Sequence, residues 1–184
     1  MKIISGKYRN FLIQHDLKSR IRPTQSRVKE SIFNIIGDIS NSHVLDLCCG
    51  SGQIGLEAIS RGAQSCIFVD IDLRCLFHNL NRLSEFDSAI FNVIELKKRD
   101  CLNYVRSKTD CDYCLDFIFF DPPWTMSERI ILTLNHIMSF DILSATGILV
   151  FEHPKSFVFT DDIRPLKTYS YGNTSISLLQ RTNE

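Results

Sequence analysis

The sequence has no long apolar run and no segment of specialised composition. No apolar run approaches the roughly 20 residues that a membrane-spanning helix needs, and residues 1–5 lack the apolar core of a secretory signal peptide. No stretch resembles a disordered tail or linker, and no internal repeat is visible. A chain of 184 residues is long enough to bury one core. We therefore expect one cytoplasmic domain over residues 1–184, with no membrane contact.

The sequence also lacks the paired cysteines or histidines of a typical zinc site. Cys111 and Cys114 form one Cys-x-x-Cys pair, but no second pair stands at zinc spacing. The seven cysteines are odd in number, and several occur where buried strands or tight turns are expected: Cys48, Cys49, Cys66 and Cys101. Reduced thiols that pack as small apolar side chains explain this distribution better than a disulfide framework does. We expect no metal.

The formal net charge is zero, but basic residues concentrate near the N-terminus. The first thirty residues carry only two acidic side chains, Asp16 and Glu30, against eight basic ones: Lys2, Lys7, Arg9, Lys18, Arg20, Arg22, Arg27 and Lys29. This asymmetry is typical of a segment that contacts a polyanion, and a merely solvated basic surface gives the same pattern.

Strand and helix patterns alternate along most of the chain. A short hairpin or extended arm is predicted over residues 2–13, and a helix from about Thr24 to Gly37. Further strands are predicted over residues 44–47, 66–69, 90–96, 117–120 and 147–151, and further helices over 54–61, 73–86, 102–106 and 130–138. The segments 167–171 and 175–180, joined by Gly172-Asn173, are predicted to pair antiparallel.

This alternation predicts an α/β fold of the Rossmann-like class, with a doubly wound, mostly parallel sheet and a C-terminal antiparallel hairpin. In such a fold, ligands bind at the carboxyl ends of the strands. We expect residues 1–40 to form a basic N-terminal appendage of hairpin and helix, and residues 41–184 to form the catalytic core.

A glycine-rich loop follows the first central strand. Gly50, Gly52 and Gly55 fit the dinucleotide fingerprint, and Asp70 lies about 20 residues beyond Gly50, where it can hold ribose hydroxyls. Asp46, just before the turn, would repel a pyrophosphate but attract the ammonium group of a methionine-like tail. We therefore predict S-adenosylmethionine as the cofactor.

The same loop and the following strand ends supply the other predicted cofactor contacts. Ser51 lies between two of the glycines, and Ile71 follows Asp70. Asp100, after the third strand, can accept from the adenine amine beside the backbone N–H of Cys101, and it can also cap the helix that follows.

The tetrapeptide Asp121-Pro122-Pro123-Trp124 directly follows an apolar strand pattern. The prolines stiffen the backbone and donate no N–H, so nearby carbonyls and the Asp121 carboxylate can act as acceptors. Trp124 offers a surface on which a base can stack. The set suits an exocyclic amine on an aromatic ring, and we predict that these four residues are catalytic.

Taken together, these motifs resemble the RsmD-type methyltransferases, which modify the exocyclic N2 of a guanine in bacterial small-subunit ribosomal RNA. The resemblance rests on Asp46 to Gly52, on Asp121-Pro122-Pro123 and, for the narrower family, on Arg22-Pro23-Thr24 joined to this core. It implies that Arg22 and Thr24 lie near the methionine end of the cofactor. It also implies 16S rRNA or the assembling small subunit as the partner, with phosphate contacts from the basic residues Lys7, Arg9, Arg20 and Arg27.

Three other functions fit parts of the pattern. Asp-Pro-Pro-Trp recognises an amine and not a named base, so a DNA adenine-N6 or cytosine-N4 methyltransferase stays open. A cofactor-binding ribosome-assembly factor and a nicotinamide oxidoreductase are the other two. His153, near a strand end, is either a proton acceptor or a packed, hydrogen-bonded side chain.

Overall fold

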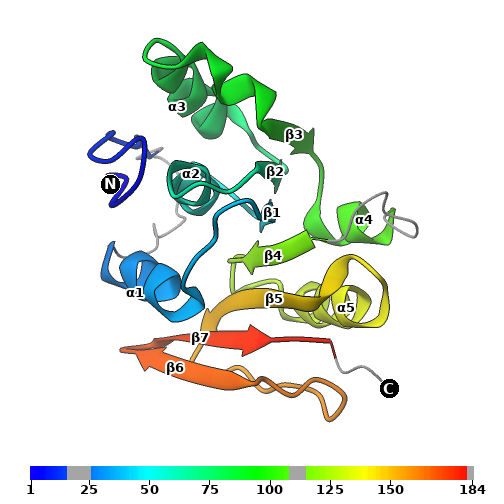
Figure 1. Ribbon diagram of the computed structural model, residues 1–184. Helices are drawn as coiled ribbons and strands as arrows, with labels where there is room; N and C mark the ends of the chain where they lie inside the picture. The colour runs from blue at the N-terminus through cyan, green and yellow to red at the C-terminus, as the bar shows by residue number, and fades with distance from the viewer. Residues whose placement is uncertain (16–25, 108–114, 182–184) are drawn as a thin grey trace.

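A computed structural model describes residues 1–15, 26–107 and 115–181 (Figure 1). Its centre is a seven-stranded sheet with the strand order β3-β2-β1-β4-β5-β7-β6. The strands are β1 (His43–Leu47), β2 (Ser65–Asp70), β3 (Ile94–Lys98), β4 (Leu115–Phe120), β5 (Leu143–Pro154), β6 (Lys167–Tyr171) and β7 (Thr174–Leu179). The first five pair in parallel, whereas β7 is antiparallel to both β5 and β6. The predicted fold class and the closing antiparallel hairpin are confirmed.

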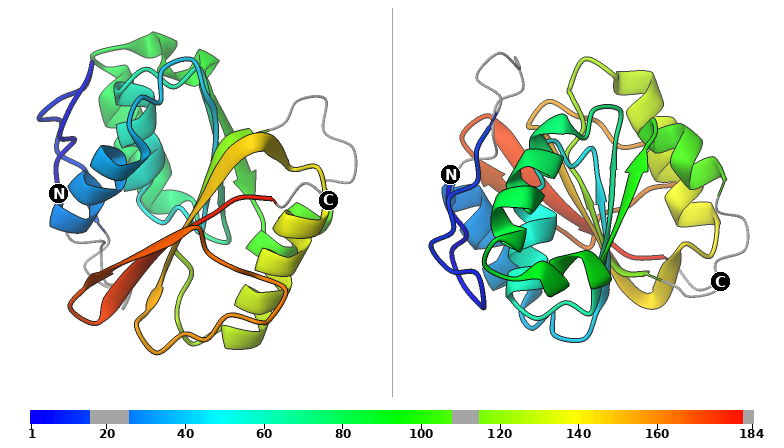
Figure 2. Two further views of the ribbon diagram at one scale, coloured as in Figure 1. Left: turned by 60° about the horizontal axis from the view of Figure 1, so that its bottom comes forward. Right: turned by 90° about the horizontal axis from the view of Figure 1, so that it is seen from above.

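Helices cover both faces of this sheet (Figure 2). On one face lie α1 (Ser26–Ile36), α2 (Gln53–Ser60) and α3 (Arg74–Ser84), and on the other lie α4 (Cys101–Arg106) and α5 (Ser127–Ser139). A hydrophobic core lies on each face of the sheet, and alternate side chains of β1 pack into one or the other. Val44 packs beneath α1, α2 and α3, whereas Leu45 and Leu47 pack beneath α4 and α5. No helix within the described ranges is long and apolar enough to cross a membrane.

One predicted strand was placed too early in the chain. Residues 90–92 of the predicted 90–96 strand belong to a 3-10 helix, η1 (Ser88–Asn92), and β3 begins only at Ile94. The Asp87 carboxylate accepts a hydrogen bond of 3.2 Å from the Ala89 N–H and caps this turn. Ile90 is fully buried, so its apolar character reflects core packing against α3 and not strand pairing.

The N-terminal segment is held to α2 by the buried carboxylate of Glu57 and by Ser60, whose carbonyl accepts from the Lys7 N–H at 2.7 Å and whose hydroxyl accepts from the Tyr8 N–H at 2.9 Å. Glu57 accepts hydrogen bonds from the Ile4 N–H at 2.8 Å and the Ser5 N–H at 3.0 Å. It also pairs with Lys29 of α1 at 3.0 Å and with Arg61 at 2.8 Å. The segment approaches so closely that a Cβ on Gly6 would lie 1.7 Å from the Ser60 carbonyl oxygen.

Lys29 corrects one inference from composition. Its place in the basic N-terminal segment suggests a side chain available to a polyanion, but this side chain is 0% exposed and is paired inside the protein with Glu57. Its ammonium also donates to the Lys2 carbonyl at 2.9 Å. The sequence pattern of an amphipathic helix does not reveal such a pair. Lysine and glutamate are usually exposed, and only the folded chain shows that these two meet in the interior.

Replacing Lys29 with Met is expected to lower the free energy of unfolding by about 3 kcal/mol, because Glu57 then loses a buried partner. Urea denaturation followed by circular dichroism measures this loss. The matched control is Lys2→Met, whose exposed ammonium contacts only the Asn10 side chain among the residues described. Equal stability of the two variants would show that the buried pair does not hold the N-terminal segment.

Candidate active site

The carboxyl ends of four adjacent strands line one cavity of about 610 Å³. Eight residues predicted from the sequence line it: Gly50, Ser51, Asp70, Ile71, Asp100, Cys101, Asp121 and Pro123. Four other predicted residues do not line it: Asp46, Gly52, Pro122 and Trp124. The parallel register explains this convergence, since neighbouring parallel strands end at the same edge of the sheet.

The glycine loop is fastened to the end of β2. The Asp70 carboxylate accepts from the Gly50 N–H at 2.8 Å with one oxygen and from the Asp72 N–H at 3.0 Å with the other. A Cβ on Gly55 would lie 2.3 Å from Cε1 of Phe68, so this glycine permits the close contact between α2 and the sheet. At Gly50 the space beside the backbone is open, which leaves room for a ligand against the loop.

Asp46 lies beneath the loop and is only 3% exposed. One of its oxygens accepts from the Gly55 N–H at 2.8 Å. Burial raises the pKa of this carboxyl to about 8, with smaller contributions from Asp121 and Asp70, while the Gly55 hydrogen bond opposes the shift. With a pKa of about 8, the Asp46 carboxyl is mostly protonated at neutral pH when no cation is nearby.

Asp100 plays the capping role that the sequence allowed. It precedes α4, accepts from the Asn103 N–H at 3.1 Å, and forms an ion pair with Arg129 of α5. Beside it, a hydrogen bond from the Cys48 thiol lowers the pKa of Cys101 to about 7. Cys48 and Cys101 thus bring two thiols together in the wall of the cavity, from the ends of β1 and β3.

Two residues of the tetrapeptide after β4 line the cavity, and the other two do not. Asp121 is half-buried and Pro123 is exposed, and both line the cavity. Pro122 is buried, whereas Trp124 is 40% exposed outside the cavity wall. The Pro123 carbonyl accepts from the Met126 N–H at 3.1 Å, which forms a tight turn before α5.

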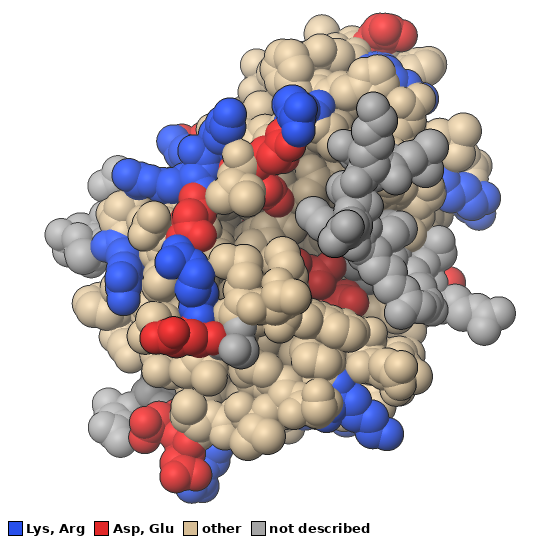
Figure 3. Space-filling view, turned by 180° about the vertical axis from the view of Figure 1, so that it is seen from behind, with Lys and Arg blue, Asp and Glu red and all other residues tan. Residues whose placement is uncertain are grey.

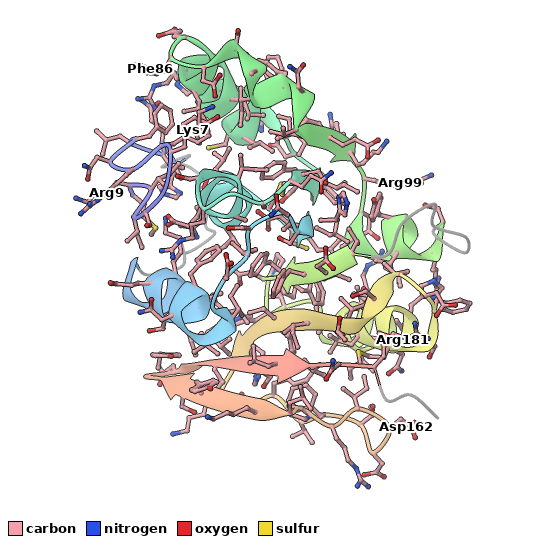
Figure 4. All side chains as sticks on the ribbon, in the orientation of Figure 1. Lys7, Arg9, Phe86, Arg99, Asp162 and Arg181 are labelled. Atoms are coloured by element: carbon pink, nitrogen blue, oxygen red, sulfur yellow. The ribbon has the colours of Figure 1, made fainter. Side chains whose placement is uncertain are left out.

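Of the basic residues predicted to touch RNA, two are described in full. Lys7 and Arg9 lie on the N-terminal segment with exposed side chains, far across the molecule from Arg99 (Figure 4). Lys7 also pairs with Asp87 at 2.5 Å. Arg20, Arg22 and Thr24 lie outside the described residues, as does the side chain of Arg27 on α1.

Comparison with known proteins identifies the family. A family described as "Conserved hypothetical protein 95" matches residues 1–180. The chain is 29% identical over 185 residues to YlbH of Bacillus subtilis (strain 168), whose name provisionally describes an rRNA methyltransferase; the match covers 98% of this chain and 99% of that protein. It is 34% identical over 126 residues to ribosomal RNA small subunit methyltransferase D of Buchnera aphidicola subsp. Baizongia pistaciae (strain Bp), covering 67% of this chain and 61% of that protein.

A solved structure, that of Escherichia coli yhhF, shares the fold with a TM-score of 0.80 and 22% identity over 100% of this chain and 99% of the other. The chain belongs to the RsmD-type methyltransferase family. The resemblance inferred from the motifs is thereby confirmed, and the seven-stranded sheet is the class I methyltransferase fold.

Several lining residues of this RsmD-type chain were missed by sequence reasoning. Gln14 and His15 come from the N-terminal segment, Gln53 opens α2, and Met126 follows the tetrapeptide. Gln53 could have been noticed, since it directly follows Gly52 in the loop. Nothing in the sequence marks Gln14 or His15, because only tertiary packing brings their segment to the strand ends.

His153 is a packed strand-end residue. It is 3% exposed, its Nε2 lies 2.8 Å from the Ser177 hydroxyl, and its Nδ1 lies 2.9 Å from the Pro154 carbonyl oxygen. Its ring also stacks on Phe151, with 4.9 Å between the centroids. Both ring nitrogens are therefore engaged in the strand pair β5 and β7, which supports the structural interpretation over a catalytic one.

The Asp46 carboxyl is expected to make the ligand-free protein less stable as pH rises from about 4 to about 8. Its pKa is raised above the ordinary value of 3.8, so over this range the folded state binds more protons than the unfolded state. Asp46→Asn keeps an oxygen for the Gly55 N–H and removes the titration. The difference in unfolding free energy between the two proteins should change by at most roughly 1.4 kcal/mol per pH unit.

Urea denaturation of the wild type and Asp46→Asn at about pH 5, 6.5 and 8 checks this slope. The variant should gain stability relative to the wild type as pH rises. A constant difference across the series would mean that Asp46 is ionised throughout.

Proposed function

We propose that this chain transfers a methyl group from S-adenosylmethionine to the exocyclic N2 of a guanine in small-subunit ribosomal RNA. The observation that carries the proposal is the convergence of Asp121, the Gly50 loop and Asp70 on one cavity. Family membership and the rRNA methyltransferase names of its relatives support the reaction class and the RNA substrate.

The cavity fits the proposed cofactor in size and in chemistry. Its volume of about 610 Å³ lies in the range of cofactor pockets. Asp70 and Asp100 each have lone pairs beyond their present contacts, suited to ribose hydroxyls and an adenine amine. When bound, the cofactor supplies an electrophilic methyl on a positively charged sulfur.

The acidic lining also suits a cationic ligand. Asp70, Asp100 and Asp121 all border the cavity, with Asp46 buried behind its loop. A positive ligand would lower the pKa of Asp46 from about 8, so that Asp46 would lose its proton and become negatively charged. The charge of Asp46 can thus adjust to a sulfonium and an ammonium.

The proposed work of the tetrapeptide is alignment of the target amine. The Asp121 carboxylate and the Pro122 carbonyl would accept from the exocyclic amine and direct its lone pair toward the cofactor side of the cavity. Trp124, exposed at the surface beside this point, would stack on the extruded base. Either Asp121 or water would take the proton that the amine releases.

Phosphate contacts are proposed for the basic N-terminal residues. Lys7 and Arg9 project from the segment that Glu57 fastens to α2 (Figure 4). Arg20 and Arg27 are proposed to extend the same contact, and Arg22 and Thr24 are proposed to lie near the methionine end of the cofactor. The partner would be 16S rRNA or the assembling small subunit, where neutralised phosphates supply sequence-independent affinity.

Methyl-labelled S-adenosylmethionine tests the proposal when it is incubated with the protein and, in separate reactions, 16S rRNA, small ribosomal subunits and duplex DNA. Nucleoside analysis should find the label in N2-methylguanosine from rRNA or from the subunits. Label in N6-methyladenine from DNA would overturn the assignment.

Asp121→Ala is expected to reduce transfer by about 100-fold or more while S-adenosylhomocysteine binding changes little, because the proposed role is in positioning the amine. The matched control is Asp162→Ala, an exposed aspartate between β5 and β6 (Figure 4). Transfer is measured by the same labelled assay and binding by calorimetry. Full turnover by Asp121→Ala would contradict the proposed mechanism.

A further inference from the structure

Two buried polar atoms in the cavity wall have no hydrogen-bond partner within the described part of the chain. They are Nε2 of His15 and Oε1 of Gln53. Both residues line the cavity, and Gln53 is only 7% exposed. An unpaired polar atom buried from water costs about 1–3 kcal/mol, so a pair of them in one cavity indicates a ligand that satisfies both.

The position of His15 is fixed by its neighbours. Asn79 of α3, fully buried, accepts from the Gln14 N–H at 2.9 Å and donates to the Gln14 carbonyl at 2.9 Å. The same amide donates to the Ser51 carbonyl at 3.1 Å, so one side chain joins the N-terminal segment to the glycine loop. The His15 ring is then placed over that loop, with Nδ1 3.0 Å from the Ser51 hydroxyl.

The protonation of His15 determines what its free nitrogen can do. Burial lowers the pKa of His15, and the charges of the N-terminal amine and Lys29 lower it further. The ring is therefore neutral at physiological pH. When the Ser51 hydroxyl donates to Nδ1, the ring proton is on Nε2, which becomes a donor without a partner among the described residues.

The two atoms together match the end of an α-amino acid. Oε1 of Gln53 accepts from an ammonium, and Nε2–H of His15 donates to a carboxylate. Both residues border the glycine loop, above the buried Asp46, whereas Asp70 and Asp100 lie at the ends of the next two strands. The ligand's amino acid end would thus lie at β1, and its nucleoside end would extend toward β2 and β3.

We propose that His15 and Gln53 form a subsite that binds the amino and carboxylate groups of the cofactor's methionine end. This inference rests on the proposed use of S-adenosylmethionine. It assigns a positioning role to residues outside the glycine loop and outside the Arg22-Pro23-Thr24 segment. Through Asn79, this subsite depends on the N-terminal segment being docked on α3.

Two ligands that differ in the amino acid end test the subsite by calorimetry. S-adenosylhomocysteine carries the ammonium and carboxylate, and 5′-methylthioadenosine lacks them. Gln53→Ala and His15→Ala should each weaken S-adenosylhomocysteine binding about tenfold or more, which corresponds to one hydrogen bond to a charged group. Neither variant should change the affinity for 5′-methylthioadenosine.

Matched variants distinguish the loss of a hydrogen bond to the ligand from a change in the shape of the cavity. His15→Gln places an amide near the position of Nε2 and should recover much of the lost affinity. His78→Ala is the control, because His78 lines the same cavity but its Nε2 is already engaged with Gln14 at 2.8 Å. Thermal unfolding of each ligand-free variant shows whether the fold is retained.

Each outcome is decisive. Selective loss of S-adenosylhomocysteine affinity supports the subsite. Equal losses for both ligands, or no loss in either variant, would overturn it while leaving the proposed function intact. A wild-type protein that binds neither ligand would instead overturn the proposed function, and the subsite with it.

Discussion

The buried carboxylate of Glu57 is the interaction on which the geometry of the cavity depends. It sits in the interior of α2 and binds backbone N–H groups of the N-terminal segment together with Lys29 and Arg61. A charge removed from water requires this full set of partners, so the segment is held in one place. The same segment continues to Gln14 and His15, so the Glu57 ion cluster and Asn79 of α3 together hold one wall of the cavity.

Acidic side chains gather at the cavity, and basic side chains of the N-terminal segment lie on the outer surface. Aspartates from the ends of β1, β2, β3 and β4 lie in or behind the cavity, whereas Lys7 and Arg9 project into solvent from the N-terminal segment. Figure 3 shows acidic side chains near the centre of one face and basic ones gathered at its upper left. An acidic interior favours a cationic ligand, and a basic exterior favours a polyanion. The proposed cofactor, S-adenosylmethionine, carries a positively charged sulfur, and the proposed substrate, rRNA, is a polyanion.

Much of the architecture could be predicted because local signals were strong. Gly172-Asn173 marked the hairpin between β6 and β7, and strand and glycine patterns located the loop between β1 and α2. Prediction failed where tertiary packing overrode a local pattern. The apolar residues 90–92 suggested a strand but belong to a capped 3-10 turn, and the surface charge assigned to Lys29 is buried. His15 carried no signal, since its role depends on Asn79, which is 64 residues away.

The sequence by itself determined the order of elements, the glycine loop and the Asp121-Pro122-Pro123-Trp124 tetrapeptide, because each is encoded by neighbouring residues whose backbone preferences act locally. It also sufficed to indicate the family. Only the tertiary structure decided which of these residues share a cavity, that Asp46 is buried beneath the loop with a raised pKa, and that His15 and Gln53 present atoms with no partner among the described residues. Burial and partner geometry set those properties, and both arise from contacts between segments far apart in the chain.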